Sequence, residues 1–266
     1  MSLLNYTLDI VTHPSRVLLD FDLPAVKCFI IANVTFWCCS FACMVLDFCV
    51  PRSTGFGKFL HSYKVQGEKS FFTMSHMLQT LGVAFINMIL IGPLIVLAFH
   101  ALWSSGVGGW YTPVPESAPF SWKRELLCFL GFVCIIDIWF YWTHRLIHHP
   151  LVYDTIHRKH HRWTAPCAAA AVYAHPFEFV VGNVAGIALG PILTNSHPYT
   201  AYFWFFFTLF RTCGAHSGYY FLGAARHDAH HEFFKYEFGV GPFCDYIFRT
   251  KLPKHLKDKQ RGRSKA

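Results

Sequence analysis

Histidine is concentrated in two short segments of the sequence. The run HRLIHHPLVYDTIHRKHH begins at His144, and HDAHH begins at His227. If these segments are helical, the spacings H-x-x-x-H and H-x-x-H-H place two or three rings on one helix face, so each cluster points its ring nitrogens at one locus. The candidate residues fall into three clusters: His144 and His148; His157, His160 and His161; and His227, His230 and His231.

Metal binding explains this density of imidazoles better than a charged surface or a pH sensor does. Packed together without a metal, the rings would be poorly hydrogen-bonded and would repel one another when protonated. A structural zinc ion takes four ligands, often including cysteine, whereas no cysteine pair here has ligand spacing. Eight to ten imidazoles suit two ions. Because imidazole binds Zn, Cu, Fe and Ni alike, the ligand type alone does not select the metal.

Two classes of protein could use such ligands. Two redox ions beside a lipid cavity would suit oxygen chemistry on an apolar substrate. The alternative is a histidine-rich metal transporter, or a membrane metal-binding protein without catalysis. Transporters place polar ligands at mid-membrane on broken helices, but here the histidines follow the ends of apolar runs, which argues against a permeation path.

The composition indicates that these histidines belong to an integral membrane protein. Charged residues make up 14% of the chain, against about a quarter in soluble domains, and the mean hydropathy is +0.31. The first two apolar runs can span a bilayer core of about 30 Å, and the third approaches the lower limit. Pro93 is expected to kink the second run, and the last two read as a tight helical hairpin. The five runs cover residues 25–50, 74–103, 126–142, 177–194 and 199–213.

Loop charges predict the orientation of the chain in the membrane. Residues 51–73 carry four Lys or Arg, whereas residues 104–121 carry none, so the positive-inside rule makes the first loop cytosolic and the second lumenal. Both histidine clusters and the tail then lie on the cytosolic side. The tail holds eight Lys/Arg from residue 249 onward. Anionic lipid is the expected partner of such a tail, and nucleic acid is not.

The predicted fold class is therefore an all-α membrane bundle with about four to five membrane-embedded helices and a cytosolic helical cap that carries a histidine-rich di-metal site. Three regions are expected: N-terminal membrane helices and loops over residues 1–125, a catalytic region over residues 126–250, and a basic cytosolic tail over residues 251–266. Eight of the ten cysteines lie in apolar runs, and no secreted disulfide framework is visible.

The histidine segments, together with AHPFEF, AHSGY and HDAHH, resemble the fatty acid hydroxylase/sterol desaturase superfamily of membrane di-iron enzymes. The run from YAHPFEFVVGN through GPILTNSHPYTAYFWF to AHSGYYF is most similar to C-4 methylsterol monooxygenases. The resemblance covers residues 137–250. It implies ten metal ligands: His144, His148, His157, His160, His161, His175, His216, His227, His230 and His231. His149 falls outside the spacing and is expected nearby or at the surface.

Three acids are candidates for orienting the ligand rings, because a metal-bound histidine usually donates its other N–H to a carboxylate or carbonyl. Asp137 lies seven residues before His144, on the same predicted helix face, and an acid inside an apolar run is expected to be functional. Glu178 follows His175 by three residues. Asp228 sits inside the last cluster, where capping a helix is an equally good explanation.

The resemblance implies an O2-dependent di-iron monooxygenase of the endoplasmic reticulum membrane that oxidises a sterol C-4 methyl group. Zinc could replace iron in a purified sample. Electrons are expected from outside the chain, because it has no flavin, nucleotide or haem-attachment motif. The resemblance implies cytochrome b5 or its reductase as the donor, with NAD(P)H as the ultimate source. A sterol side-chain hydroxylase, a sterol desaturase and a fatty-acyl or sphingolipid hydroxylase remain alternatives. The chain departs from the methylsterol branch at FLGAAR, residues 221–226, where that branch carries a longer insert.

Overall fold

The structure is a computed structural model that describes residues 12–69, 73–104 and 114–263. Throughout these ranges the chain forms helices and irregular segments but no strands, which confirms the predicted all-α fold class. Four helices there are long and apolar enough to cross a membrane. They cover Pro24–Phe48, Met74–His100, Trp122–Ile147 and Pro176–Thr194.

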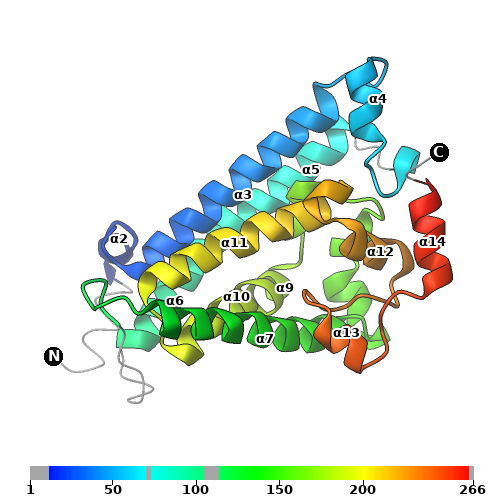
Figure 1. The fold of residues 1–266 in the computed structure, drawn as a ribbon. Coiled ribbons are helices and arrows are strands. Elements are labelled where there is room, and N and C mark those ends of the chain that lie inside the picture. Colours follow the sequence, from blue (N-terminus) through cyan, green and yellow to red (C-terminus); the bar gives the residue numbers. More distant parts are fainter. Residues whose placement is uncertain (1–11, 70–72, 105–113, 264–266) are drawn as a thin grey trace.

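The bundle is built from two pairs of long helices (Figure 1). Helix α3 (Pro24–Phe48) packs along α11 (Pro198–His216), and α7 (Trp122–Ile147) packs along α10 (Ala185–Thr194). In Figure 1, α11 and α7 leave a common region near α6 (Gly92–Ser104) at a wide angle, and α12 (Ala225–Phe233) lies between their C-terminal ends. The long helices therefore bring two distant chain segments to the same end of the molecule.

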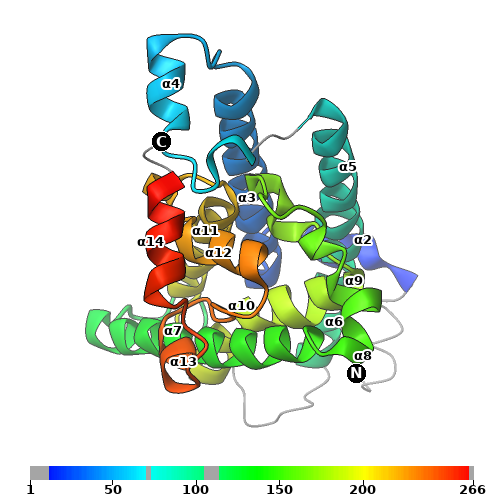
Figure 2. The ribbon, with the colours of Figure 1, turned by 90° about the vertical axis from the view of Figure 1, so that its right-hand side faces the viewer.

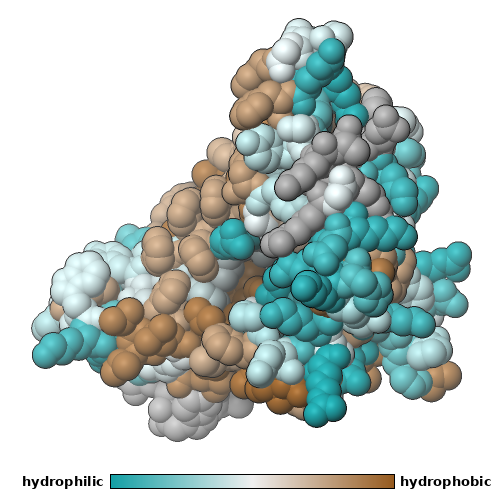
Figure 3. All heavy atoms as spheres, turned by 45° about the vertical axis from the view of Figure 1, so that its right-hand side comes forward, coloured by the Kyte–Doolittle hydropathy of each residue, from teal (hydrophilic) through white to brown (hydrophobic). Residues whose placement is uncertain are grey.

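Short helices close this end. In Figure 2, α14 (Lys254–Arg263) and α13 (Phe243–Ile247) lie on the left of the view, α12 lies near its centre, and α8 (Pro150–Val152) lies at the lower right. Figure 3 shows hydrophobic residues along the helical side of the molecule and hydrophilic residues on the side where these short helices lie. This division matches a membrane bundle with a polar cap. The remaining short helices are α2 (Pro14–Leu18), α4 (Gly55–His61) and α9 (Pro176–Glu178).

The structure differs from the prediction in the bend of one helix and in the length of another. The second apolar run was expected to kink at Pro93, but α5 (Met74–Phe85) instead enters a π-helical turn over Ile86–Ile91 just before that proline. Such turns are a known cause of helix bending. The third run is longer than its apolar stretch, because the 26-residue helix α7 continues through polar residues at both ends.

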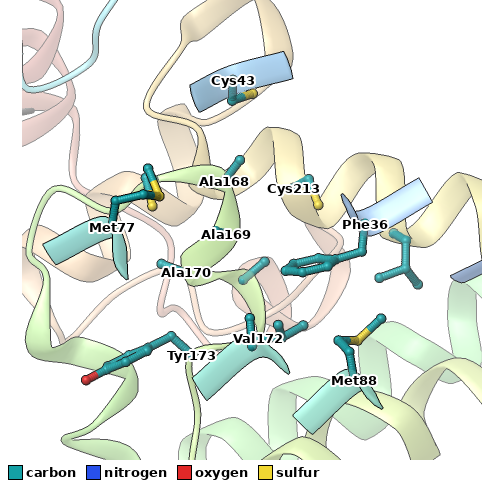
Figure 4. Packing of buried hydrophobic residues seen from close by; sticks show 14 of the residues in the cluster. Phe36, Cys43, Met77, Met88, Ala168, Ala169, Ala170, Val172, Tyr173 and Cys213 are labelled. Carbon is teal, nitrogen blue, oxygen red and sulfur yellow. The ribbon is translucent and has the colours of Figure 1, made fainter. Parts of the chain in front are cut away.

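The core contains an irregular segment that the apolar pattern does not reveal. Ala168–Val172 form a 3₁₀ turn buried among α3, α5 and α11 (Figure 4). Four consecutive alanines let the backbone approach these helices closely. The buried amide of Asn87 donates hydrogen bonds to the Val172 and Ala174 carbonyl oxygens over 2.8 and 3.1 Å, which satisfies polar groups that could not reach water.

Four helices begin at a His-Pro pair. In three of them the ring Nδ1 accepts a hydrogen bond from the backbone N–H two residues later, with proline at the first helical position. Proline suits that position because its missing N–H would have no partner there. The three capping histidines are His149, His175 and His197. This local role competes directly with metal binding.

Contact between α7 and α10 depends on a residue without a side chain. A Cβ atom on Gly190 would lie 2.9–3.0 Å from three atoms of Phe132. We expect Gly190→Ala to lower the melting temperature of the purified protein in detergent by roughly 2–10 °C, because overpacking costs about 1–3 kcal/mol.

Gly82→Ala is the matched control, since nothing lies within 4 Å of its Cβ position in α5. This change should leave the melting temperature unchanged or raise it, because alanine favours helix. Equal effects of the two substitutions on thermal unfolding would contradict the close packing of α7 against α10.

Candidate metal centre

Nine of the ten histidines expected as ligands converge at the capped end of the bundle. They form two groups, and within each group one potential ligand atom per residue lies within 4.8 Å of every other. All are buried except His148 and His227, which are half-buried. The first group is His144, His148, His157, His161 and His230; the second is His160, His216, His227 and His231.

The rings of the first group meet through their Nε2 atoms. That of His157 lies 3.1 Å from that of His144 and 3.0 Å from that of His148. The Nε2 atom of His230 lies 3.0 Å from that of His148 and 3.1 Å from that of His161. Five nitrogens therefore surround one small volume.

The second group has the same arrangement. The Nε2 atom of His227 lies 2.8 Å from that of His216 and 3.2 Å from that of His231. His160 completes the group at 3.4 Å from His216. The two groups adjoin, because the ring centroids of His161 and His231 are only 4.6 Å apart. Ions held by the two groups would be neighbours.

Backbone carbonyls fix which nitrogen of several rings carries the proton. The Nδ1–H of His144 donates to the Phe238 oxygen over 2.7 Å, and that of His230 donates to the Tyr236 oxygen over 2.7 Å. In the second group, His216 donates to the Thr212 oxygen and His231 to the Trp163 oxygen. Since a carbonyl only accepts, each neutral ring presents a bare lone pair at Nε2.

The carboxyl group of Glu178 lies beside the outer nitrogen of His157. Its Oε1 is 2.9 Å from Nδ1 of that ring, and both groups are buried. In the first group, the carbonyl partners of His144 and His230 leave the Nε2 atoms of both rings without a proton and aimed at the other rings. Lone pairs gathered in this way repel one another unless a cation lies among them, and a hydrogen bond from the outer nitrogen is the orientation that metal-bound imidazoles normally show. The residues present therefore fit a pair of metal ions.

Burial also keeps these rings in the form that binds metal. Desolvation, followed by repulsion from neighbouring imidazoles, lowers the pKa of His157, His161 and His230 well below the ordinary value of 6.5. The same causes lower the pKa of His148 to about 2. The rings are accordingly neutral at physiological pH, as ligation requires.

The expectation that each sequence cluster serves one locus holds for His144 and His148 but is wrong for the two H-x-x-H-H clusters. On the continuous helix α12, His230 belongs to the first group, whereas His227 and His231 belong to the second. The other H-x-x-H-H segment is also divided: His157 ends a π-helical turn and joins the first group, and His160 opens a 3₁₀ turn and joins the second. Rings three or four residues apart point to adjacent sites.

The structure does not bring His175 together with the other nine rings, so its expected ligand role stays a prediction. This ring lies outside both groups, where its Nδ1 accepts the Phe177 N–H and caps α9. The capping bond explains the difference, because it turns the ring toward the helix end. His149 lies exposed at the start of α8, in agreement with its expected place outside the ligand set.

The three acids expected to orient rings have different positions. Glu178 contacts His157 directly. Asp137 does not contact a ring directly. Its two oxygens accept hydrogen bonds from the N–H groups of Gly241 and Cys244, in the segment that supplies the Phe238 carbonyl to His144. Asp228 lies inside α12 rather than at its cap, and its Oδ1 accepts a hydrogen bond of 2.6 Å from Gln66.

The sequence did not predict a buried contact between residues 63–65 and residues 218–220, which follow His216 of the second group. Residues 63–65 run antiparallel to residues 218–220, directly after His216, with Val65 N–H donating to the Gly218 oxygen. The Nζ of Lys64 lies 2.7 Å from Oδ1 of Asp47 and donates to the Ser217 oxygen. The loop after α4 thus fixes the position of the segment that connects α11 to α12. No sequence motif signals this long-range ion pair.

Two cavities reach the histidines. The larger, of about 1110 Å³, extends along α11 from Pro198 to His216, roughly 27 Å of helix. Its lining is mostly apolar, and four ligand candidates face it: His144, His160, His216 and His227. A second cavity of about 520 Å³ reaches His148 from another side, between Arg145 and Lys235. An apolar molecule in the larger cavity could approach both groups.

Comparison with known proteins is consistent with this site. Residues 129–250 match the family model described as fatty acid hydroxylase. The chain is 33% identical over 222 residues to human fatty acid hydroxylase domain-containing protein 2, covering 81% of this chain but only 63% of the relative. It thus spans less than two thirds of that relative's length.

Two other relatives have a similar level of sequence identity to this chain. A Dictyostelium discoideum relative is 30% identical over 234 residues, covering 84% of this chain and 82% of the relative. The C-4 methylsterol oxidase of Schizosaccharomyces pombe is 35% identical over 160 residues, covering 54% of this chain and 51% of the relative. No solved structure is significantly similar.

The division of α12 between the two groups can be tested by metal content. His230→Ala removes a ring from the first group and His231→Ala removes one from the second, so each should lower the metal bound by the iron-loaded protein from two ions per chain to about one. Mass spectrometry of the purified protein measures this content.

His149→Ala and His175→Ala are the controls and should retain both ions, because neither ring belongs to a group. A loss with His175→Ala as large as with His230→Ala would contradict the separation of that ring from the centre.

Proposed function

The chain belongs to the fatty acid hydroxylase family, and on that premise we propose that it is a membrane-bound di-iron monooxygenase that oxidises a C-4 methyl group of a sterol precursor. One observation carries the proposal: two adjoining groups of histidines, nine rings in all, lie at one end of a long apolar cavity. This combination suits oxygen chemistry on a lipid better than it suits metal storage, which needs no such cavity.

The reaction proposed consumes O2 and two electrons. When bound, a pair of iron ions supplies the reductive activation of O2 that oxidation of an unactivated C–H bond requires. For each hydroxylation, one oxygen atom enters the C–H bond, and the other leaves as water with two protons and two electrons from the donor. A methyl group would reach the carboxylate level after successive oxidations. Iron fits a set of imidazoles, although zinc could replace it in a purified sample.

The residues of the chain provide the holding, the orientation and the dry surroundings. The nine rings would hold the two ions, and the carbonyl partners of four rings keep their lone pairs aimed inward. Glu178, 2.9 Å from His157, would hold that ring in place. The apolar wall of the larger cavity, which includes Phe140 and Phe205, would exclude water from the reacting carbon and place it beside the second group.

A sterol is the substrate that we favour within the family. The larger cavity has a volume of about 1110 Å³ and runs the length of α11, which suits a rigid ring system with a tail. A relative named as a C-4 methylsterol oxidase supports the same substrate class. Because C-4 lies at one end of the ring system, the sterol side chain would point along α11, away from the histidines.

We further propose that the electrons enter at the polar side of the molecule. Cytochrome b5 or its reductase, with NAD(P)H as the ultimate donor, fits the family resemblance. The second cavity reaches His148 between Arg145 and Lys235, and opposite charge would steer an acidic donor to it. The endoplasmic reticulum membrane, with the histidines and the C-terminus on the cytosolic side, is the proposed location.

The proposed reaction is tested with the purified, iron-loaded protein, reduced and supplied with a 4-methylsterol and labelled O2. We expect labelled 4-hydroxymethyl and 4-carboxyl products by mass spectrometry. His160→Ala should abolish product formation while leaving membrane insertion intact, because it removes a ring of the second group. His149→Ala should have a much milder effect.

Two outcomes would overturn the proposal. One zinc ion per chain without oxidation of any lipid would indicate a non-catalytic metal-binding protein. Oxidation of a sterol side chain, a fatty acyl chain or a sphingolipid, but not of the 4-methylsterol, would place the chain in another branch of the family.

A further inference from the structure

We propose that Arg211, whose guanidinium packs against Gly223, forms a binding subsite for a carboxylate group at the histidine end of the larger cavity. The inference deepens the proposed function and rests on it for the identity of the ligand, because methyl oxidation ends in a carboxylate. The subsite itself is argued from the surroundings of Arg211 alone.

Arg211 is the single charged residue of an otherwise uncharged helix. It interrupts the aromatic run of α11, YFWFFFTLFRTCGAH, and it lines the larger cavity. Its side chain is exposed, so the charge can meet a ligand or water. His216 follows Arg211 by five residues, roughly 7.5 Å along the helix axis, and both residues line the larger cavity.

The charge of Arg211 has no counterpart in the described part of the chain. Three Lys or Arg residues line the larger cavity. Lys27 is paired with Glu116, and Arg226 with the buried Glu237 and Asp245. Of the carboxylates described, none pairs with Arg211, whose hydrogen bond is a long one of 3.4 Å from Nη1 to the Leu222 oxygen.

The guanidinium of Arg211 packs against the backbone of Gly223, in the space that a side chain would occupy. A Cβ atom there would lie 2.8 Å from both Nη1 and Nη2 of Arg211, and the backbone has φ +85°, a conformation that glycine adopts freely. The bare backbone therefore lets the planar group rest against residues 221–226, the segment that is shorter here than in the methylsterol branch. His227 follows Gly223 by four residues, so the same segment joins the cation to the second histidine group.

A carboxylate is the ligand that this arrangement suits. The guanidinium presents several N–H donors in a fixed fork that matches two carboxylate oxygens, and one weak carbonyl contact leaves most of them free to bind. During stepwise oxidation the neutral methyl and hydroxymethyl stages would not engage this charge, whereas the final carboxylate would. The subsite would thus recognise the oxidised end of the lipid.

Equilibrium binding to the purified protein in nanodiscs of neutral phospholipid tests the subsite without turnover. The probes are a 4-carboxysterol and the matching 4-hydroxymethyl sterol. We expect Arg211→Met to weaken binding of the carboxysterol on the order of ten- to hundredfold, as loss of a charged hydrogen-bonded pair does, and to leave the neutral alcohol within about twofold. Arg211→Lys should retain part of the affinity, because it keeps the charge without the fork.

Lys123→Met is the control, because it removes an exposed cation at the far end of α7; it should leave both affinities unchanged. Equal weakening of the two sterols by Arg211→Met, or no weakening of either, would overturn the carboxylate subsite. An effect confined to nanodiscs that contain phosphatidic acid would overturn it too, since Arg211 would then contact a membrane headgroup.

Palmitate and its methyl ester separate the subsite from the proposed substrate. If Arg211 discriminates palmitate from its ester while the carboxysterol does not bind, the carboxylate subsite stands and the sterol assignment fails. If the carboxysterol binds in the Arg211-dependent manner, both stand.

Discussion

Buried imidazole lone pairs that face one another at about 3 Å are the constraint on which this molecule is built. Carbonyl oxygens hold the protons of four rings on their outer nitrogens, two rings in each group, so the Nε2 lone pairs of these rings are aimed into the groups. Cations at the centre of each group would turn the repulsion between these lone pairs into binding. The metal centre is therefore prepared by the backbone around it as much as by the histidines themselves.

The rest of the fold serves that arrangement from two directions. The long helices α7 and α11 deliver His144, His148 and His216 to one end of the bundle, and the same two helices line the cavity that leads there. Next to the rings, the Lys64–Asp47 ion pair fixes the segment that follows α11. Asp137 fixes the segment that supplies the Phe238 carbonyl. Buried polar groups of this kind are stable because each is paired.

Much of this architecture could be predicted from local sequence. Apolar runs give the membrane helices, and regular spacing identifies eight of the nine converging rings; only His216 needed the family resemblance. The sequence could not show how the rings divide between the groups, because π-helical and 3₁₀ turns alter the direction of His157 and His160. Nor did the spacing place His175 apart from the other rings, although its His-Pro pair is a capping signal shared with His149 and His197. The Lys64–Asp47 pair joins distant segments, so no periodicity reveals it.

X-ray absorption spectroscopy of the iron-loaded protein tests the central claim most directly, because it reports the ligand atoms and any neighbouring metal together. The account predicts a first shell that includes four to five imidazole nitrogens per ion and no sulfur, with a second iron close enough to scatter. A thiolate ligand, or an isolated ion without a metal neighbour, would contradict it.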